Sequence, residues 1–343
     1  MANNKPNILL IYTGGTIGMI KDFETGALRN FNFNDLLKHI PELKLLDCDI
    51  ATTSFKEPID SSNMNPAYWV DIATIIEEKY DEFDGFVVLH GSDTMSYTAS
   101  ALSFMLENLS KPVVFTGSQL PIGDLRTDAK ENLITSIQIA ALREKGHSKI
   151  TEVCLYFEYK LYRANRTTKI NAEHFEAFAS LNYPALAESG VHLTVNDNAL
   201  LAVNRRKKLK VHKRMESNIL LVKMFPGIDE TTITYLFEYP EIKGLVLETY
   251  GSGNITNELW FLKALKKLMS KGIPVINVTQ CSGGSVAMGQ YETSIDLKKM
   301  GVISGKDATT EAALAKLMYL LGQEVTTNSF KTIFETSLRG EMQ

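Results

Sequence analysis

The feature that most constrains the fold is a regular alternation of short apolar runs with longer segments of helical spacing. The first half of the chain holds four runs rich in β-branched and aromatic residues: NILLIYT, GFVVLHG, KPVVFTG and EVCLYFE. The segments between them, PAYWVDIATIIEEKYDEF, YTASALSFMLENL and DAKENLITSIQIAALREK, have helical periodicity. Buried parallel strands read as continuous apolar runs and alternate with helices. The pattern therefore predicts an α/β fold built on a parallel-type sheet flanked by helices.

The alternation stops and then resumes, which predicts a second domain. Strand-like SNILLVKMFPG, KGLVLETYGSGN and GIPVINVTQ are followed or interleaved by helical NELWFLKALKKLMSKG and TEAALAKLMYLLGQE. A length of 343 residues also exceeds one typical domain. We expect a larger N-terminal domain at residues 1–194, a linker at 195–216 and a smaller parallel α/β domain at 217–343.

The break between the two patterns carries seven basic residues from Arg205 to Arg214. A nucleic-acid patch would need aromatic residues or a known module around such charges, and neither is present. The net charge of -4 also disfavours a polyanionic partner. We interpret the basic run as a solvated connection and predict no nucleic-acid partner.

Composition and the chain start predict a cytoplasmic protein with no membrane segment. The N-terminus, MANNKPN, leads directly into a predicted strand without a signal-peptide apolar stretch. No apolar run reaches the ~20 residues that a membrane span needs. The three cysteines, Cys48, Cys154 and Cys281, are widely spaced and odd in number. This favours reduced thiols over a disulfide framework.

Small polar residues follow each predicted strand: Thr13–Thr16, Gly91–Thr94, Thr116–Gln119, Gly251–Asn254 and Thr279–Gly284. The carboxyl ends of parallel strands meet at one edge of a sheet, where ligands bind. Glycine allows close approach of a ligand, and exposed N–H groups can hold a carboxylate or an oxyanion. Turns and helix caps use the same residues. The five strand ends together favour a site for a small polar ligand and leave open whether one hydroxyl is a nucleophile.

Several other site types are not predicted. The six histidines form no HExxH pair, and no two cysteines have ligand spacing, so we predict no metal site. The chain has no GxSxG, P-loop or GxGxxG motif. His90 ends an apolar strand, which favours a packed, hydrogen-bonded histidine over a catalytic one. A hydroxyl nucleophile would then need another activator, such as lysine.

Two segments in order, TGGTIGM and HGSDTMSYTASALSFMLENL, resemble the signatures of bacterial-type L-asparaginases. The matches DSSNM, TGSQLP, LYRANRTTK, AFASLNYPAL, ETYGSGN, TQCSGG and LRGE place the chain with the cytoplasmic type I branch, and the resemblance covers essentially the whole chain. It implies hydrolysis of L-asparagine to L-aspartate and ammonia without metal or cofactor. It also implies a left-handed crossover in the N-terminal domain, and dimers or tetramers with active sites near a subunit interface.

The resemblance assigns roles residue by residue. Thr16 matches the nucleophile, and Ser92, Asp93 and Lys169 match a hydroxyl–Asp–Lys set that forms a second catalytic centre. The family usually has threonine where this chain has Ser92. The sequence leaves open whether Lys169 is neutral and helps Ser92 act as a base, or stays charged and organises the site.

The resemblance also implies a substrate-binding set. The substrate is a zwitterion, so carboxylates suit its ammonium group, while hydroxyls and loop N–H groups suit its carboxylate. Asp93 is expected to take the ammonium as well, and Asn254 to reach the site from the other domain or a neighbouring subunit. The residues assigned to binding are Gly15, Asp60, Ser61, Ser62, Gly91, Ser118 and Asn254.

Two departures from the family pattern concern activation and regulation. Most relatives have a tyrosine in the loop after the nucleophile, where this chain has Ala27, so Tyr291 is our candidate replacement. A tyrosine packed in a subunit interface is the alternative for Tyr291. Several relatives bind a second asparagine through an arginine and the TQC cysteine. This chain has Glu248 at the arginine position, so we predict absent or altered regulation and a buried, inert Cys281.

Two other functions are compatible with the same residues. One is a non-catalytic amino-acid-binding or sensor protein that kept the pocket and lost turnover. The other is the ammonia-producing subunit of a tRNA-dependent amidotransferase. That subunit normally carries an extra N-terminal module, for which a TGGT motif at residue 13 leaves no room.

Overall fold

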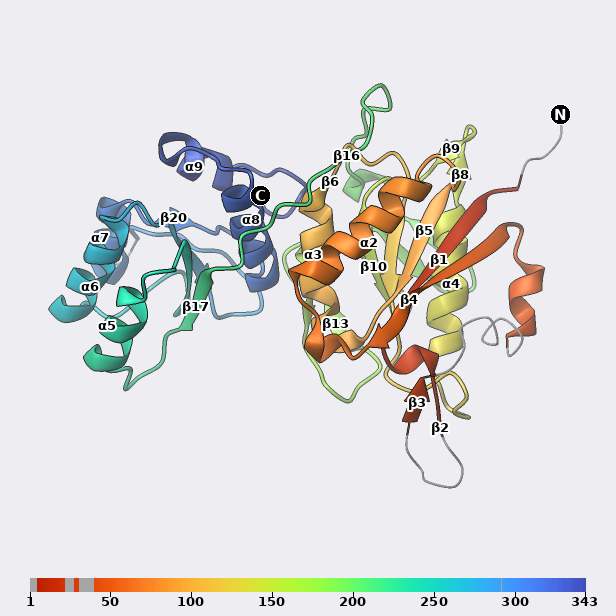
Figure 1. The fold of residues 1–343 in the computed structure, drawn as a ribbon, viewed down its shortest axis with the longest axis horizontal. Helices are drawn as coiled ribbons and strands as arrows, with labels where there is room; N and C mark the ends of the chain where they lie inside the picture. Colours follow the sequence, from red (N-terminus) through yellow and green to blue (C-terminus); the bar gives the residue numbers. More distant parts are fainter. Residues whose placement is uncertain (1–4, 22–27, 31–39, 291) are drawn as a thin grey trace. The chain divides into compact units, whose positions relative to one another are not determined.

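The computed structural model describes residues 5–21, 28–30, 40–290 and 292–343. The chain divides into two compact units, Met1–Lys213 and Arg214–Gln343, each with its own sheet and helices (Figure 1). The division falls within the segment 195–216, which the sequence predicts as a linker.

The main sheet of unit 1 has eight strands within the described residues, in the order β15-β14-β11-β10-β7-β5-β1-β4. In chain order these are β1 (Asn7–Gly14), β4 (Asp49–Ile59), β5 (Gly85–Leu89), β7 (Val113–Thr116), β10 (Val153–Phe157), β11 (Lys160–Arg163), β14 (Ala187–Ser189) and β15 (Leu193–Val195). Neighbours from β10 to β4 are parallel, whereas β11, β14 and β15 continue antiparallel. The predicted strands β1, β5, β7 and β10 are confirmed, and the sheet is mostly parallel.

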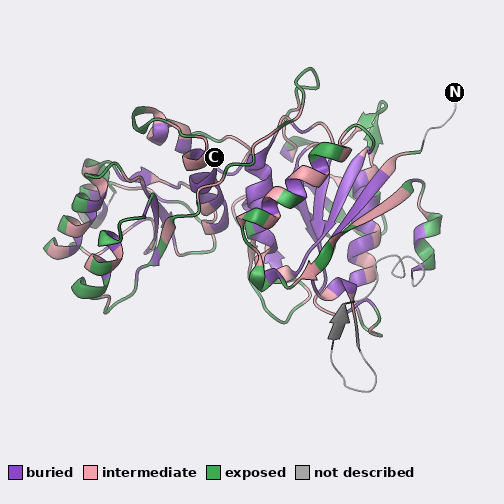
Figure 2. Cartoon of the chain, in the orientation of Figure 1, coloured by how far each residue is buried: buried purple, intermediate pink, exposed green. Residues whose placement is uncertain are grey.

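Both faces of the central strands of this sheet are buried, which explains why these strands read as continuous apolar runs (Figure 2). Ile8, Leu10 and Tyr12 of β1 form one core cluster with Leu133 and Ile137 of α4 (Ala129–Ala141). The other helices, α2 (Pro66–Lys79) and α3 (Met95–Met105), cover the opposite face (Figure 1). The three predicted helices of this unit are therefore confirmed.

Among the described residues, unit 1 also contains four short strand pairs: β2 (Met19–Lys21) with β3 (Leu28–Asn30), β6 (Leu106–Glu107) with β16 (Lys210–Val211), β8 (Arg143–Glu144) with β9 (His147–Ser148), and β12 (Thr168–Lys169) with β13 (Phe178–Ala179). The β16 pairing lies in the basic segment, so part of the predicted linker is attached to unit 1. Residues 205–208 of that segment are exposed, as predicted for solvated charges.

Unit 2 is a four-stranded parallel sheet, β17 (Ile219–Lys223), β18 (Gly244–Thr249), β19 (Val275–Thr279) and β20 (Ile303–Ser304), in that order. Its helices are α5 (Glu230–Glu238), α6 (Leu259–Met269), α7 (Glu292–Met300), α8 (Thr310–Gly322) and α9 (Thr327–Phe334). The predicted strands β17–β19 and helices α6 and α8 are confirmed. In the described part of the chain, no helix combines the length and apolar character needed to cross a membrane.

Candidate active site

The carboxyl ends of β4, β1, β5 and β7 lie side by side, because these four strands are consecutive parallel neighbours. The register pairs Gly14 at the end of β1 with Ile59 at the end of β4, and Tyr12 with Leu89 at the end of β5. The segments that follow these strands therefore meet at one edge of the sheet. They carry most of the residues that the sequence assigns to catalysis and binding.

Glycine is required where the segments after β1 and β5 touch. Gly15 has a φ of 89°, and a Cβ added there would lie 2.5 Å from both Cα and N of Gly91. A Cβ on Gly91 would in turn lie 2.5 Å from Oγ of Ser61, in the segment after β4. A side chain at Gly15 or Gly91 would force the three segments apart. Both glycines therefore allow the neighbouring hydroxyls to lie close together.

The two threonines of the TGGT motif are in different environments. Thr13 is buried, and its hydroxyl donates to the carbonyl of Leu89 at 3.0 Å. Thr16 begins a 3-10 helix, Thr16–Gly18, and is partly exposed at the sheet edge. Among the described residues, no hydrogen-bond partner engages the Thr16 hydroxyl. Only the second threonine thus offers a hydroxyl to a ligand.

Ser92, Asp93 and Lys169 form one hydrogen-bonded group, although 76 residues separate Asp93 from Lys169 in the sequence. Lys169 Nζ donates to Ser92 Oγ at 2.8 Å and to Asp93 Oδ1 at 2.7 Å. Lys169 lies on β12, where Phe178 of β13 is its paired residue. Ser92 and Asp93 begin a 3-10 helix, Ser92–Thr94, directly before α3. The geometry is that of a lysine that donates to both a hydroxyl and a carboxylate.

The segment after β4 presents a carboxylate and two hydroxyls. Asp60 is exposed, and its Oδ1 accepts from the backbone N–H of Ser62 at 2.8 Å. This hydrogen bond lowers the pKa of Asp60, so the carboxylate remains charged well into acid. Ser61 is buried, and its carbonyl accepts from Thr94 Oγ1 at 2.8 Å, which ties the segment to the end of β5. A charged Asp60 suits a ligand ammonium group.

The segment after β7 adds Ser118 and Gln119. Ser118 is buried, and its hydroxyl donates to the carbonyl of Leu120 at 2.6 Å. The Ser118 hydroxyl hydrogen is therefore engaged within its own loop, and a contact with substrate stays a prediction. Gln119 was not assigned a role from sequence, yet its Oε1 accepts from Ser92 Oγ at 3.2 Å. Only the folded arrangement reveals this contact.

Two buried titratable residues lie beneath the site, and burial favours the neutral form of each. His90 is fully buried, its Nδ1 contacts the Gly91 carbonyl at 2.7 Å, and burial lowers its pKa to about 4. The prediction of a packed, hydrogen-bonded histidine is confirmed. Tyr12 is also buried, and burial raises its pKa to about 12. Its hydroxyl lies 2.2 Å from where a Cβ on Gly18 would be. Neither residue has the exposure or the pKa of a general base.

Asn254 belongs to unit 2, in a turn after β18. Tyr250 and Asn254 exchange two backbone hydrogen bonds, at 2.8 and 2.9 Å, around Gly251 and Gly253, which have positive φ. Asn277 Nδ2 donates to the carbonyl of Gly253 at 3.1 Å and holds this turn on β19. The turn is well defined within its unit, and the approach of Asn254 to the site stays a prediction.

The structure bears differently on the residues that the sequence links to activation and regulation. Ala27 and Tyr291 lie outside the described residues. Glu248 accepts from Thr310 Oγ1 at 2.6 Å and pairs with Lys223 at 3.5 Å. The prediction of a buried Cys281 is wrong, because this thiol is exposed. The buried part of β19 ends at Thr279, and the cysteine falls in the exposed turn two residues later.

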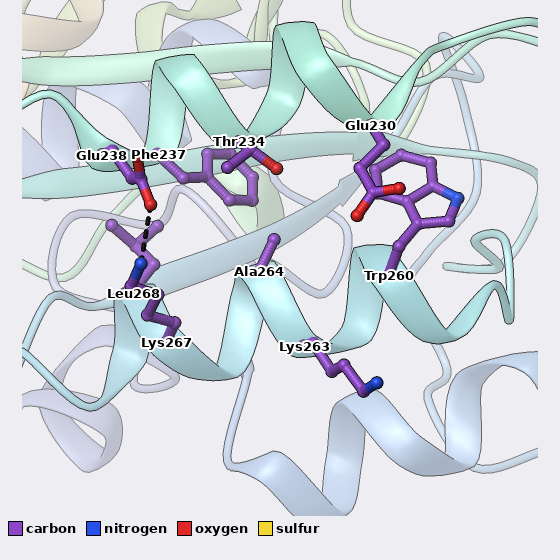
Figure 3. A pocket seen from close by; sticks show the side chains of 9 residues that line it. All are labelled: Glu230, Thr234, Phe237, Glu238, Trp260, Lys263, Ala264, Lys267 and Leu268. Carbon is purple, nitrogen blue, oxygen red and sulfur yellow. Dashed lines mark hydrogen bonds and ion pairs between the residues drawn. The ribbon is translucent and has the colours of Figure 1, made fainter.

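A cavity of ≈190 Å³ also lies between α5 and α6 of unit 2 (Figure 3). Glu230 and Trp260 lie beside each other at one end, and Lys267 pairs with Glu238 at 2.6 Å at the other (Figure 3). None of its lining residues follows a strand end. No group of three possible metal ligands occurs among the residues that the structure describes.

Comparison with known proteins yields matches along nearly the whole chain. The family model "Asparaginase, N-terminal" matches residues 7–201, and "Glutaminase/Asparaginase C-terminal domain" matches residues 218–334. L-asparaginase 1 of Escherichia coli K12 is 42% identical, over 98% of each chain. The crystal structure of L-asparaginase I from Vibrio cholerae superposes with a TM-score of 0.90 at 40% identity, covering 99% of each chain.

One relative has a different printed activity. The 60 kDa lysophospholipase of Mus musculus is 40% identical over 98% of this chain, but the match covers 62% of the mouse protein. More than a third of that protein therefore has no counterpart in the match. The name lysophospholipase therefore describes the mouse protein, and we do not apply it to this chain.

Proposed function

The chain belongs to the asparaginase family, and from that premise we propose that it hydrolyses L-asparagine to L-aspartate and ammonia. The observation that carries the proposal is the meeting of two hydroxyl centres on neighbouring strands of a family-typical fold. Thr16 follows the first strand with an available hydroxyl, and Ser92 follows the next strand in the sheet, where it is bound by a lysine, Lys169, that also binds Asp93.

In this mechanism Thr16 is the nucleophile. Its Oγ attacks the side-chain amide carbon of asparagine, and the hydroxyl proton passes to the leaving nitrogen through a neighbouring base. The C–N bond breaks, ammonia leaves and an ester links Thr16 to the aspartyl group. Water then adds to the ester carbon, the bond to Oγ breaks and Thr16 regains its hydrogen. Backbone N–H groups at the strand ends suit the oxyanion of each step.

The remaining site residues bind the substrate and serve the proton transfers. Asp60 and Asp93 receive the α-ammonium group, and the hydroxyls and N–H groups of the segment after β4 receive the α-carboxylate. Ser92 and Lys169 act on the side of the leaving ammonia and the incoming water. General acid–base help of this kind contributes ~10²–10⁴-fold.

The test is ammonia release from L-asparagine by the wild type and two matched variants. Thr16→Val should lower kcat by at least ~10⁴-fold, because the nucleophile is gone. Thr13→Val makes the same change in the same turn but removes only the bond to Leu89, so kcat should fall less than ~10-fold. Turnover that survives Thr16→Val would remove Thr16 from the mechanism. A wild type that binds asparagine without releasing ammonia would favour the sensor function.

Activation of Thr16 is a separate part of the proposal. With Ala27 at the usual tyrosine position, Tyr291 supplies the phenol that contacts the nucleophile. Tyr291→Phe should then lower kcat by ~10²-fold or more with an intact fold. Near-normal turnover in this variant would remove Tyr291 from the mechanism and leave Lys169 as the remaining candidate base.

We also propose a cytoplasmic homo-oligomer, dimer or tetramer, with active sites near the subunit interface. Support for the oligomer comes from large apolar side chains exposed on the segments after β7, β12 and β13, namely Leu125, Ile170 and Leu181. Support for a reducing compartment comes from Cys48, Cys154 and Cys281, which are all free. Light scattering on the purified protein distinguishes monomer, dimer and tetramer.

A further inference from the structure

We propose that Gln119 is a positioning residue that fixes the hydrogen of the Ser92 hydroxyl and so keeps Ser92 a hydrogen-bond acceptor toward the reacting groups. This inference rests on the proposed function, in which Ser92 belongs to the second catalytic centre. It is carried by the contacts of one amide group with two other segments of unit 1, one holding Ser92 and one holding Ala172 and His174.

The chemistry of its neighbours fixes the orientation of the Gln119 amide. One end of the amide faces the backbone carbonyls of Ala172 and His174, at 3.1 and 2.9 Å. Carbonyls only accept, so this end must be Nε2, which has two hydrogens to donate. Oε1 is then the atom that faces Ser92, 3.2 Å from its Oγ. An amide oxygen only accepts, so the serine hydroxyl must donate to it.

The two hydrogen-bond partners of the Ser92 hydroxyl therefore leave one lone pair of its oxygen free. Its hydrogen goes to Gln119, and one of its two lone pairs accepts from Lys169 Nζ at 2.8 Å. The second lone pair is left for a donor, which in the proposed reaction is water or the leaving ammonia. Without Gln119 the hydroxyl could rotate and direct its hydrogen at the same group. The Gln119 amide thus determines that the Ser92 oxygen accepts a hydrogen bond from the reacting group and does not donate one to it.

The Gln119 backbone is anchored from the start of α4. Asp128 is buried, and its carboxylate accepts from the N–H of Gln119 at 2.9 and 3.1 Å and of Leu120 at 3.2 Å. Asn132, one turn later and fully buried, donates to Asp128 and to the carbonyl of Gly117, at 3.2 and 3.1 Å. A satisfied buried network of this kind holds one loop geometry before substrate arrives.

The carbonyls that the amide binds are also held in place. Asn171 Oδ1 accepts from the N–H groups of Glu173 and His174, both at 2.8 Å, which fixes a turn two residues after Lys169. Gln119 therefore connects three segments: the end of β5 with Ser92, the end of β7 with its own loop, and the turn that follows Lys169 on β12. The Gln119 side chain thus links the Ser92 hydroxyl to the turn that follows its other partner, Lys169.

The experiment is a double-mutant cycle on kcat for ammonia release, with Gln119→Met and Ser92→Ala. Gln119→Met keeps the length of the side chain and removes both hydrogen-bonding ends. In the wild-type background we expect kcat to fall roughly 3- to 10-fold with KM nearly unchanged, the size of one lost hydrogen bond. In the Ser92→Ala background the same change should have no further effect, because its target is absent.

Thr127→Val is the matched control. Thr127 bonds the Leu120 carbonyl at 3.2 Å and the Ala129 N–H at 3.0 Å in the same loop, and the structure records no bond from it to Ser92. Its kcat should stay within ~2-fold of wild type. Gln119→Leu replaces Gln119→Met in the cycle if the latter does not fold, as judged by its thermal midpoint.

An equal loss of kcat from Gln119→Met in both backgrounds would overturn the positioning role and leave a merely structural one. Full kcat in Gln119→Met would overturn it as well. Neither result touches the proposed function, which fails separately if the wild type releases no ammonia or if Thr16→Val retains turnover.

Discussion

The ends of β1 and β5 are neighbours in one sheet, yet they hold their hydroxyls in opposite ways. Thr16 after β1 has a hydroxyl that no described residue binds, whereas Ser92 after β5 is bound by Lys169 and Gln119. A nucleophile needs an unoccupied oxygen, and a helper needs a fixed orientation. The contrast supports different roles for two hydroxyls that the sequence presents in similar Gly-flanked loops.

The residues beneath the two strand ends are alike in one respect. Tyr12 under the first and His90 under the second are both buried, and burial disfavours the charged form of each. Neither can exchange a proton with a ligand near pH 7. We therefore propose Lys169, or Tyr291, which lies outside the described residues, as the group that serves proton transfer at the site.

The largest effect on this comparison should come from Lys169→Met, which removes the group that holds Ser92. We expect kcat to fall ~10²–10⁴-fold, the range of general acid–base catalysis. Lys149→Met is the matched control, because Lys149 also binds two side chains, the carboxylates of Glu144 and Asp197, at 2.8 and 2.5 Å. Its kcat should stay within ~2-fold. A comparable loss in both variants would mean that fold, and not chemistry, was damaged.

The next largest effect is on the free energy of unfolding, and it tests whether His90 is neutral in the folded protein. Its folded pKa of about 4 lies below the ordinary 6.5, so the unfolded chain binds the proton more readily. The contribution of neutral His90 to the free energy of unfolding is complete above pH 6.5. As the pH falls toward 4, this free energy decreases by roughly 3 kcal/mol in total. Urea unfolding at several pH values should show this loss in the wild type, and a smaller loss in His90→Gln. Identical pH dependence in both proteins would show that His90 is not neutralised by folding.

A smaller effect is expected from Asp60→Asn, on the β4 side of Thr16. Loss of the carboxylate should raise KM for asparagine ~10- to 100-fold with little change in kcat, as for a lost charged hydrogen bond. Because the pKa of Asp60 is lowered, KM of the wild type should not rise on this account between pH 7 and 5. Asp71→Asn, an exposed change on α2, is the control. A loss confined to kcat would place Asp60 in the chemistry instead of in binding.

The smallest effect should come from Ser118→Ala. The Ser118 hydroxyl already donates to Leu120, so its removal should change kcat/KM by about 3-fold or less. A loss of tenfold or more, measured with asparagine as substrate, would show that this hydroxyl turns to the substrate and that the resting contact is exchanged on binding.

The central strands were predictable because both of their faces are buried and they read as apolar runs. β4 was missed, since Asp49–Ile59 lies at the sheet edge and is mostly exposed or half-buried, so its sequence lacks such a run. Helices α5, α7 and α9 were also missed; each has only eight or nine residues, too few for a clear helical period. The left-handed crossover stays a prediction.

The candidate site was predictable to the extent that the resemblance located its residues. Ser92, Asp93 and Lys169 were placed together from motifs, and the structure gives them hydrogen-bonding distances. The role of Gln119 could not be predicted, because it depends on an amide that is oriented by two segments distant from it in the sequence. The only local signal is Asp128 with Asn132 one turn later, at the start of a helix that follows a strand end.

Mass spectrometry of the protein quenched in acid during turnover shows whether Thr16 forms the covalent bond with the substrate. Lys169→Met or Ser92→Ala, in which ester hydrolysis should be slowed, is mixed with asparagine and digested. We expect the peptide holding Thr16 to gain the mass of one aspartyl group. An aspartyl adduct on the peptide holding Ser92, or steady ammonia release with no adduct on Thr16, would contradict it.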